Sequence, residues 1–169
     1  DEGRVSVAGV GDSLAVLAMR QSHGVYSPSI LNTPHKPEQP KERARIEAAG
    51  GKVDAYDPKV VDEDKKHVPK RVWYRNNPDD AGCKAMTGLA MTRSLGDTMA
   101  HRAGVSCVPG IEYDVLDDED EFIVVASDGV WDMLDVQTVV DKVQEYIINY
   151  GHEDGLLGWS PERASQYIC

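Results

Sequence analysis

The residues best suited to chemistry in this sequence are acidic residues that follow short apolar runs. Residues 122–126 form a run rich in β-branched side chains, and Ser127-Asp128-Gly129 interrupts it. This pattern predicts a buried strand that ends in a carboxylate. A buried carboxylate costs free energy unless it is compensated, and Mg²⁺ or Mn²⁺, which prefer oxygen ligands, can compensate it. Gly129 would let the backbone turn tightly beside the ion.

A second candidate, Asp12, lies between the apolar runs of residues 4–10 and 14–19. Two such runs around Gly11-Asp12-Ser13 predict a hairpin with Asp12 exposed at its tip. For both Asp12 and Asp128 a plain turn is the alternative, since Asp, Ser and Gly favour turns on conformational grounds alone. The residues by themselves leave that choice open.

Composition and charge exclude several classes of function. The 169 residues, 41% hydrophobic and 28% charged, fit one domain with a real core. There is no signal-like amino terminus and no run of about 18 apolar residues, which favours an intracellular protein, cytoplasmic or nuclear, without membrane insertion. The net charge of −11 argues against a nucleic-acid partner.

The cysteines exclude thiol chemistry. Cys83, Cys107 and Cys169 are too few and too scattered for a disulfide framework, which favours a reducing compartment. A cysteine-dependent phosphatase needs an Arg six positions after its thiolate, where this sequence has Leu89 and Tyr113.

Several signals place the helices. Pro40 predicts the start of a helix, and Gly50 or Gly51 predicts its end. Asp135 predicts the cap of a second helix with an apolar face, and Ser160-Pro161 predicts the start of a third.

Residues 52–80, between the first and the second predicted helix, form a proline-containing insertion. Its cluster of basic and aromatic residues at positions 65–74 indicates either a substrate-contacting flap or a solvated face with aromatic anchors.

Four stretches together resemble the PP2C-type metal-dependent Ser/Thr protein phosphatases. They are Gly-Asp-Ser at residues 11–13, His-Lys-Pro at 35–37, Leu-Ala-Met-Thr-Arg-Ser-Leu-Gly-Asp at 89–97 and Val-Val-Ala-Ser-Asp-Gly-Val-Trp-Asp at 124–132. We expect residues 86–96, which include most of the third stretch, to form a helix-like segment that ends at Gly96. His35 is expected to be structural. Arg93 and Asp97 could contact phosphate or metal or could equally form a buried structural ion pair, and the resemblance favours the structural role.

The resemblance implies a fold and a metal site. The fold is α/β (α+β), a PP2C-like α-β-β-α sandwich of two mainly antiparallel sheets flanked by helices. In the intact domain Asp128, with the adjacent backbone of Gly129, would be one of several ligands of two catalytic Mg²⁺ or Mn²⁺ ions, and Asp12 would join Asp128 at an accessory third ion. The reaction would be hydrolysis of phosphoserine and phosphothreonine in phosphoprotein substrates.

Two motifs of that family are missing from the sequence. They are an Asp-Gly-His-Gly-Gly motif before Asp12 and an Asp-Asn motif after the last helix, both of which supply metal ligands. We therefore expect residues 1–169 to be a single partial domain, incomplete at both ends and inactive alone. The alternative is a non-catalytic, phosphatase-like module that binds another protein.

Overall fold

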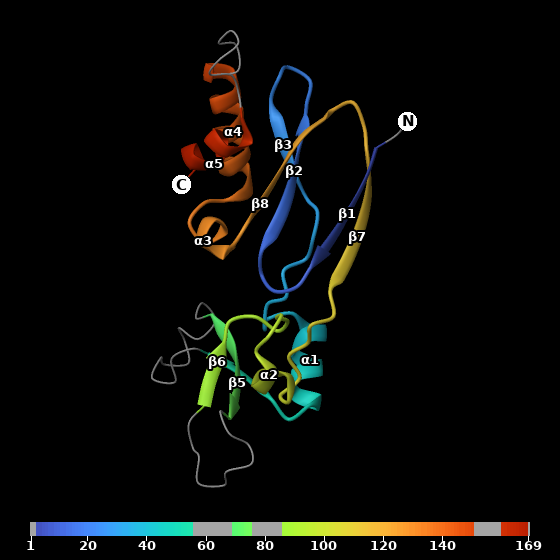
Figure 1. The fold of residues 1–169 in the computed structure, drawn as a ribbon, viewed down its shortest axis with the longest axis vertical. Helices are drawn as coiled ribbons and strands as arrows, with labels where there is room; N and C mark the ends of the chain where they lie inside the picture. The colour runs from blue at the N-terminus through green and yellow to red at the C-terminus, as the bar shows by residue number, and fades with distance from the viewer. Residues whose placement is uncertain (1–2, 56–68, 76–85, 151–159, 169) are drawn as a thin grey trace. The chain divides into compact units, whose positions relative to one another are not determined.

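A computed structural model of the protein describes residues 3–55, 69–75, 86–150 and 160–168. The chain divides into two compact units, each described here by itself (Figure 1). Unit 1 comprises Asp1–Ala8, Ser13–Thr33 and Ile111–Cys169. Unit 2 comprises Gly9–Asp12 and Pro34–Gly110.

Unit 1 is built on two sheets. One sheet has the order β3-β2-β8, with β2 antiparallel to both neighbours, and the other joins β1 and β7. The strands are β1 (Gly3–Gly9), β2 (Leu14–Arg20), β3 (Tyr26–Ile30), β7 (Gly110–Leu116) and β8 (Asp120–Ala126). The hairpin predicted around Asp12 is therefore wrong, because β1 and β2 belong to different sheets.

The sheets and helices of unit 1 form three layers. The helices are α3 (Asp128–Trp131), α4 (Val136–Tyr150) and α5 (Pro161–Ile168). On one face of the three-stranded sheet, the fully buried Val16 packs in the same cluster as Val140 of α4. On the other face, Leu17 packs with Val7 of β1 and Leu116 of β7. The order helix, sheet, sheet agrees with three of the four layers of the predicted sandwich.

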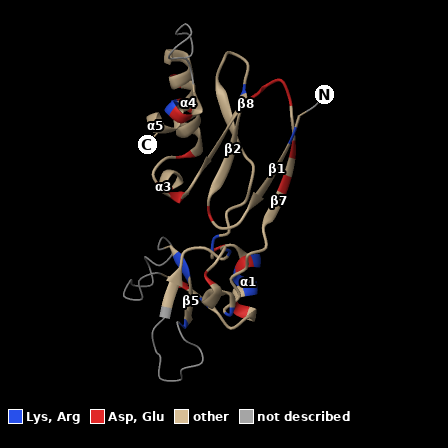
Figure 2. Cartoon of the chain, in the orientation of Figure 1, with Lys and Arg blue, Asp and Glu red and all other residues tan. Residues whose placement is uncertain are grey.

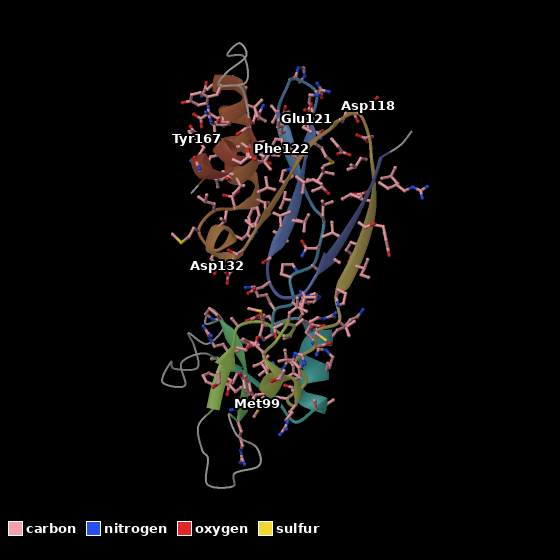
Figure 3. The ribbon with its side chains drawn as sticks, in the orientation of Figure 1. Met99, Asp118, Glu121, Phe122, Asp132 and Tyr167 are labelled. Carbon is pink, nitrogen blue, oxygen red and sulfur yellow. The ribbon has the colours of Figure 1, made fainter. Side chains whose placement is uncertain are left out.

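Strand β8 is buried on one side only. Phe122, labelled in Figure 3, packs against the buried cluster that contains Val16 and Val140 of α4. Val125 pairs with Ala15 and is 71% exposed, and Ile123 pairs with Leu17 and is 40% exposed. The prediction of a strand is confirmed, but the prediction that the strand is buried is wrong for the face that carries Ile123 and Val125. A continuous apolar run does not reveal how much of each face the neighbouring layers cover.

The two carboxyl-side helices begin where the sequence predicts. The Asp135 carboxylate accepts hydrogen bonds from the Thr138 backbone N–H at 3.0 Å and from the Thr138 hydroxyl at 2.7 Å. At α5 the Ser160 hydroxyl accepts the Arg163 N–H at 3.3 Å. Both side chains thus satisfy backbone donors that a helix start leaves without a partner.

Unit 2 is a small antiparallel sheet covered by helices. Strands β4 (Lys52–Ala55), β5 (Lys70–Arg75) and β6 (Met86–Leu89) pair in that order, and the helices are α1 (Pro40–Ala48) and α2 (Thr98–His101). Pro40 opens α1 as predicted. The core of the unit consists of Ile46, Val53, Val72, Ala100 and Val105.

Two predictions for unit 2 need comment. The expected helix-like segment up to Gly96 is wrong, because it begins as strand β6, which pairs with β5 through tertiary contacts that local sequence does not encode. Most of the predicted flap, residues 56–68 and 76–80, lies outside the described residues. Within the part of the chain that the structure describes, no helix is long and apolar enough to cross a membrane.

Candidate metal centre

Asp128 stands at the junction of β8 and α3 in unit 1. Ser127 has extended backbone angles, and its carbonyl accepts the Val130 N–H at 3.1 Å, which starts the helical turn. The indole N–H of Trp131 donates to the Ala126 carbonyl at 2.9 Å, so the turn is tied back to the end of the strand. The position of the Asp128 backbone is thereby fixed at both ends of a short turn.

The Asp128 carboxylate is half-buried. Among the described residues it has no ion pair and no side-chain hydrogen bond. Because it keeps contact with solvent, its desolvation cost is smaller than a fully buried strand end would impose, and the burial argument for a bound cation loses force. Its oxygens nevertheless suit a hard divalent ion, so this residue fits the role of a single metal ligand.

A second carboxylate, which the sequence reasoning missed, follows one turn later. Asp132 donates its backbone N–H to the Asp128 carbonyl at 2.8 Å, and its side chain is exposed (Figure 3). Residues four apart on a helical turn lie on the same face. This spacing in Asp-Gly-Val-Trp-Asp was the signal that could have drawn attention to it.

Gly129 does not have the conformational role predicted for it. It lies inside α3, and its φ is not among the positive values found in the described backbone. A Cβ added there would come no closer than 3.6 Å to Ser127 Oγ, which is ordinary van der Waals contact. The tight-turn explanation is therefore wrong, while a backbone role beside a metal stays a prediction.

Asp12 belongs to unit 2 and is almost completely buried, at 9% exposure. Its Oδ2 lies 2.7 Å from Lys36 Nζ. The expectation of an exposed turn residue is wrong, because the chain at this point joins strands of two sheets instead of reversing within one. Lys36 is the partner that sequence reasoning missed, although its place in His-Lys-Pro was a signal.

His35 holds the same loop through Gly11. The His35 backbone N–H donates to the Gly11 carbonyl at 2.8 Å, and its Nδ1 lies 3.3 Å from Gly11 N. His35 is 5% exposed, and this burial lowers the pKa of its imidazole. The structural role expected for His35 is what the contacts show.

A buried ionic network centred on Glu42 is connected to the His35 backbone through Thr92. Its two carboxylate oxygens lie 2.7 Å from Arg93 Nη2 and 2.6 Å from Arg45 Nη2. Thr92 donates its hydroxyl to Glu42 at 2.6 Å and its backbone N–H to the His35 carbonyl at 2.8 Å. The network thus connects α1 to the loop that carries Asp12.

The network sets the charge of Glu42. Burial by itself would raise the pKa of this carboxyl, but hydrogen bonds from Arg93, Thr92 and Arg45 outweigh it and lower the pKa to about 2. Arg93 is structural, as predicted, but its partner is Glu42 and not the exposed Asp97.

The structure therefore gathers Asp12, Lys36, His35, Glu42 and Arg93 in unit 2, and places Asp128 in unit 1. Each candidate ligand is described in its own unit. Within the described residues no group of three or more His, Cys, Asp or Glu side chains is arranged to hold a metal ion. Asp128 fits as one carboxylate ligand, whereas Asp12 already has a cation beside it.

Comparison with known proteins decides the family. The family model of protein phosphatase 2C matches residues 1–169. The chain belongs to this family. The curated relatives include probable protein phosphatase 2C 52 of Arabidopsis thaliana, 42% identical over 134 residues, and probable protein phosphatase 2C 75 of Oryza sativa subsp. japonica, 38% identical over 137 residues. These alignments cover 79% and 81% of this chain.

The chain is short relative to these phosphatase 2C relatives, since it spans 26% and 28% of their lengths. Two solved structures share its fold with a TM-score of 0.70. They are a serine-threonine phosphatase 2C from Toxoplasma gondii, at 20% identity, and a C. elegans sex determining protein, at 22% identity. The match covers 88% and 98% of this chain, and 45% and 32% of those chains. The mixed α/β fold with antiparallel sheets is thus that of phosphatase 2C.

Proposed function

We propose that this chain is part of a metal-dependent phosphatase that hydrolyses phosphoserine and phosphothreonine in proteins. Membership of the phosphatase 2C family supports the reaction type. The observation that carries the residue assignment is the Asp128 carboxylate, held at the end of β8 by the α3 turn and without a protein partner among the described residues.

In this proposal Asp128 contributes one oxygen ligand to Mg²⁺ or Mn²⁺. When bound, such ions lower the pKa of coordinated water and offset charge on phosphoryl oxygens, and no covalent enzyme intermediate is needed. The chain's own contribution is positional: the hydrogen bonds from the Trp131 indole to the Ala126 carbonyl and from the Val130 N–H to the Ser127 carbonyl fix the backbone that carries Asp128. Gly129 would lie beside the ion through its backbone, and Asp12 would act only at an accessory ion.

Substrates and location are also proposals. Phosphoproteins are the substrate class that the family supports. An intracellular location, cytoplasmic or nuclear, is supported by three scattered cysteines, which suit a reducing compartment.

The experiment compares two polypeptides with a phosphothreonine peptide across a Mn²⁺ titration. The first carries this sequence together with the two missing family motifs, and we expect turnover that requires Mn²⁺ and is lost on chelation. The second is the 169-residue chain alone, for which we expect negligible turnover. Turnover of the longer polypeptide that persists under exhaustive chelation would contradict metal dependence. Strong turnover by the 169-residue chain would mean that the site is misassigned.

A further inference from the structure

Strand β8 is an edge strand of the sheet β3-β2-β8 in unit 1, and among the described residues no strand pairs with its other side. Two hydrogen bonds of β2 show which way the backbone groups of this sheet point. On the β3 side, the Leu31 N–H donates to the Ala15 carbonyl at 2.9 Å. On the β8 side, the Arg20 N–H donates to the Glu119 carbonyl at 2.7 Å. Because these groups alternate along an antiparallel strand, the odd-numbered residues of β2 point theirs toward β3 and the even-numbered residues toward β8.

The register between β2 and β8 then identifies the groups on the free side of β8. Val124 lies opposite Val16, an even-numbered residue, so its N–H and C=O point toward β2. Ile123 and Val125 lie opposite odd-numbered residues, so their N–H and C=O point to the free side. In the described part of the chain no hydrogen bond reaches these groups of Ile123 and Val125, which we call the β8 edge. Unpaired groups of this kind are a template for an added strand.

The opposite edge of the same sheet, on β3, is blocked. Pro28 lies opposite Ala18, an even-numbered residue, so its nitrogen is on the outer side and has no hydrogen to donate. The Tyr26 carbonyl on that side accepts a hydrogen bond from the side-chain amide of Gln137 of α4 at 2.9 Å. Proline and covering side chains are common ways of protecting a sheet edge. Residues 122–126 of β8 contain neither a proline nor a charged residue, so the β8 edge lacks this protection.

Both faces beside the β8 edge offer apolar surface. On the face away from α4, Ile123 is 40% exposed and Val125 is 71% exposed. On the α4 face a groove of about 430 Å³ lies between β8 and α5. Phe122, labelled in Figure 3, and Val124 line this groove together with Val143 of α4. A strand added at the β8 edge would place its side chains over both surfaces, as in other cases of β-strand addition.

The charges of β8 favour a second copy of the chain, in antiparallel orientation, as the added strand. The acidic residues lie at the start of β8, in the run of residues 117–121 that Figure 2 shows in red between β7 and β8. A parallel pair would place two such runs side by side, whereas an antiparallel pair places them at opposite ends. With Val124 on the twofold axis, Ile123 of each copy lies opposite Val125 of the other. Every group of the β8 edge then has a hydrogen-bonding partner.

We propose that this chain forms a twofold dimer in which the β8 edges of two copies pair antiparallel in this register. Pairing removes apolar surface of Ile123 and Val125 from water, which favours association. Because Pro28 and Gln137 block the outer edge of β3, the joined sheet cannot grow further, and assembly closes at two copies. The proposal does not depend on the phosphatase reaction.

Sedimentation velocity of the 169-residue chain, between low and high micromolar concentrations, measures the dimer Kd. We expect an equilibrium between monomer and dimer that depends on concentration. Each copy carries a net charge of −11, so added salt should screen the repulsion between copies and lower the Kd. A monomer at every concentration would leave the β8 edge to an extended segment of another polypeptide, and assemblies larger than a dimer would contradict closure. Either result overturns the proposal.

A matched pair of double variants tests the register. Ile123→Lys with Val125→Glu places opposite charges directly across the dimer, whereas Ile123→Lys with Val125→Lys places like charges there. We expect the Kd of the second variant to be at least about tenfold higher than that of the first. The second variant has the smaller net negative charge, which by itself would favour association, so the general field of the chain does not explain such a result. Equal Kd values, or loss of the dimer in both variants, would contradict the pairing.

Hydrogen exchange locates the contact in the unmodified chain. The amides of Ile123 and Val125 should exchange slowly only at concentrations at which the dimer forms, while the Val124 amide, which points toward β2, should be protected throughout. Ile123→Pro removes a donor of the β8 edge at a position like that of Pro28 on β3, so the fold should be kept while the Kd rises at least about tenfold. A dimer in which the Ile123 and Val125 amides exchange freely would place the interface elsewhere and overturn the proposal.

Discussion

Asp12 and Asp128 occupy similar sequence contexts, each beside a glycine and a serine at the end of an apolar run, yet their surroundings differ. Asp128 is half-buried, ends a strand whose face opposite α4 is exposed, and has no ion pair among the described residues. Asp12 is almost completely buried and paired with Lys36 at 2.7 Å. The structure therefore leaves one carboxylate open to an external cation and supplies the other with an internal one.

In the function proposed above, this difference lets the protein use one residue type for two purposes. A buried carboxylate needs a compensating charge within the fold, and Lys36, backed by His35 and the Glu42 network, supplies that need for the Asp12 loop. A half-exposed carboxylate on a short, pinned turn is stable in water and can exchange water for a metal. The following variants test this contrast, starting with the largest expected effect.

The largest effect is expected for Asp128→Asn in a polypeptide that contains the complete phosphatase domain. The amide keeps the shape but removes the charge that attracts a divalent ion, so activity at saturating Mn²⁺ should fall more than about 100-fold. The melting temperature should change little, because the side chain has no protein ion pair to lose. Asp141→Asn, an exposed acid on α4, is the control. Near-parental activity of Asp128→Asn would contradict the metal-ligand assignment and favour a plain structural turn at residues 127–129.

Glu42→Gln should produce the largest loss of stability in the 169-residue chain. The substitution leaves Arg93 and Arg45 without their shared carboxylate, and we expect the free energy of unfolding to fall by roughly 3 kcal/mol. Glu47→Gln, which breaks an exposed pair with Arg43 on the same helix, should cost less than about 0.5 kcal/mol. Urea unfolding measures both. Equal losses of unfolding free energy for Glu42→Gln and Glu47→Gln would contradict a stabilising role of the Glu42 network.

The same network predicts the pH dependence of stability. Glu42 has a pKa of about 2 in the folded chain, against 4.5 for the ordinary carboxyl, so the unfolded state binds a proton at higher pH than the folded state does. Its stabilising contribution is complete above pH 4.5 and is lost as the pH falls from 4.5 toward 2. Urea unfolding over this range should show a steeper loss for the parent chain than for Glu42→Gln. Parallel profiles would contradict the depressed pKa.

A double-mutant cycle of Asp12→Asn and Lys36→Met measures the internal ion pair directly. We expect a coupling energy of roughly 1–3 kcal/mol, because Lys36→Met alone leaves a buried carboxylate without its cation. The matched cycle is Asp54→Asn with Lys52→Met, an exposed pair with the same distance of 2.7 Å, whose coupling should stay below about 1 kcal/mol. Equal coupling in the two cycles would remove the distinction between Asp12 and a surface acid.

The smallest effect is expected for Gly129→Ala. The added Cβ meets only Ser127 Oγ at 3.6 Å, and alanine favours a helix, so stability should stay the same or rise by up to about 1 kcal/mol. Gly104→Ala is the positive control, because Gly104 has φ of +94° and an added Cβ would lie 2.9 Å from Ala49 Cβ. Thermal unfolding separates the two. A large loss for Gly129→Ala would restore the tight-turn role.

Local signals in the sequence were sufficient for the helix starts and for β8. The signals for the helix starts are local. The side chains of Asp135 and Ser160 accept hydrogen bonds from backbone donors three residues later, and Pro40 lacks a backbone donor that the start of α1 would leave without a partner. The apolar run of β8 and the resemblance of residues 124–132 likewise depend on contiguous residues. These features could be predicted without knowledge of the neighbouring layers.

What tertiary structure alone decided was pairing and burial. The predicted hairpin failed because the partner of β1 is β7, about a hundred residues away in sequence, and not the adjacent β2. The surroundings of the two aspartates followed from the same cause. Lys36 pairs with Asp12 across a gap in sequence, and Glu42 is connected to the Asp12 loop through Thr92 and His35, while Asp128 depends on its own turn. A sequence specifies which groups carry charge, but the desolvation of each charge depends on which distant segments pack against it, and that is fixed only when the chain folds.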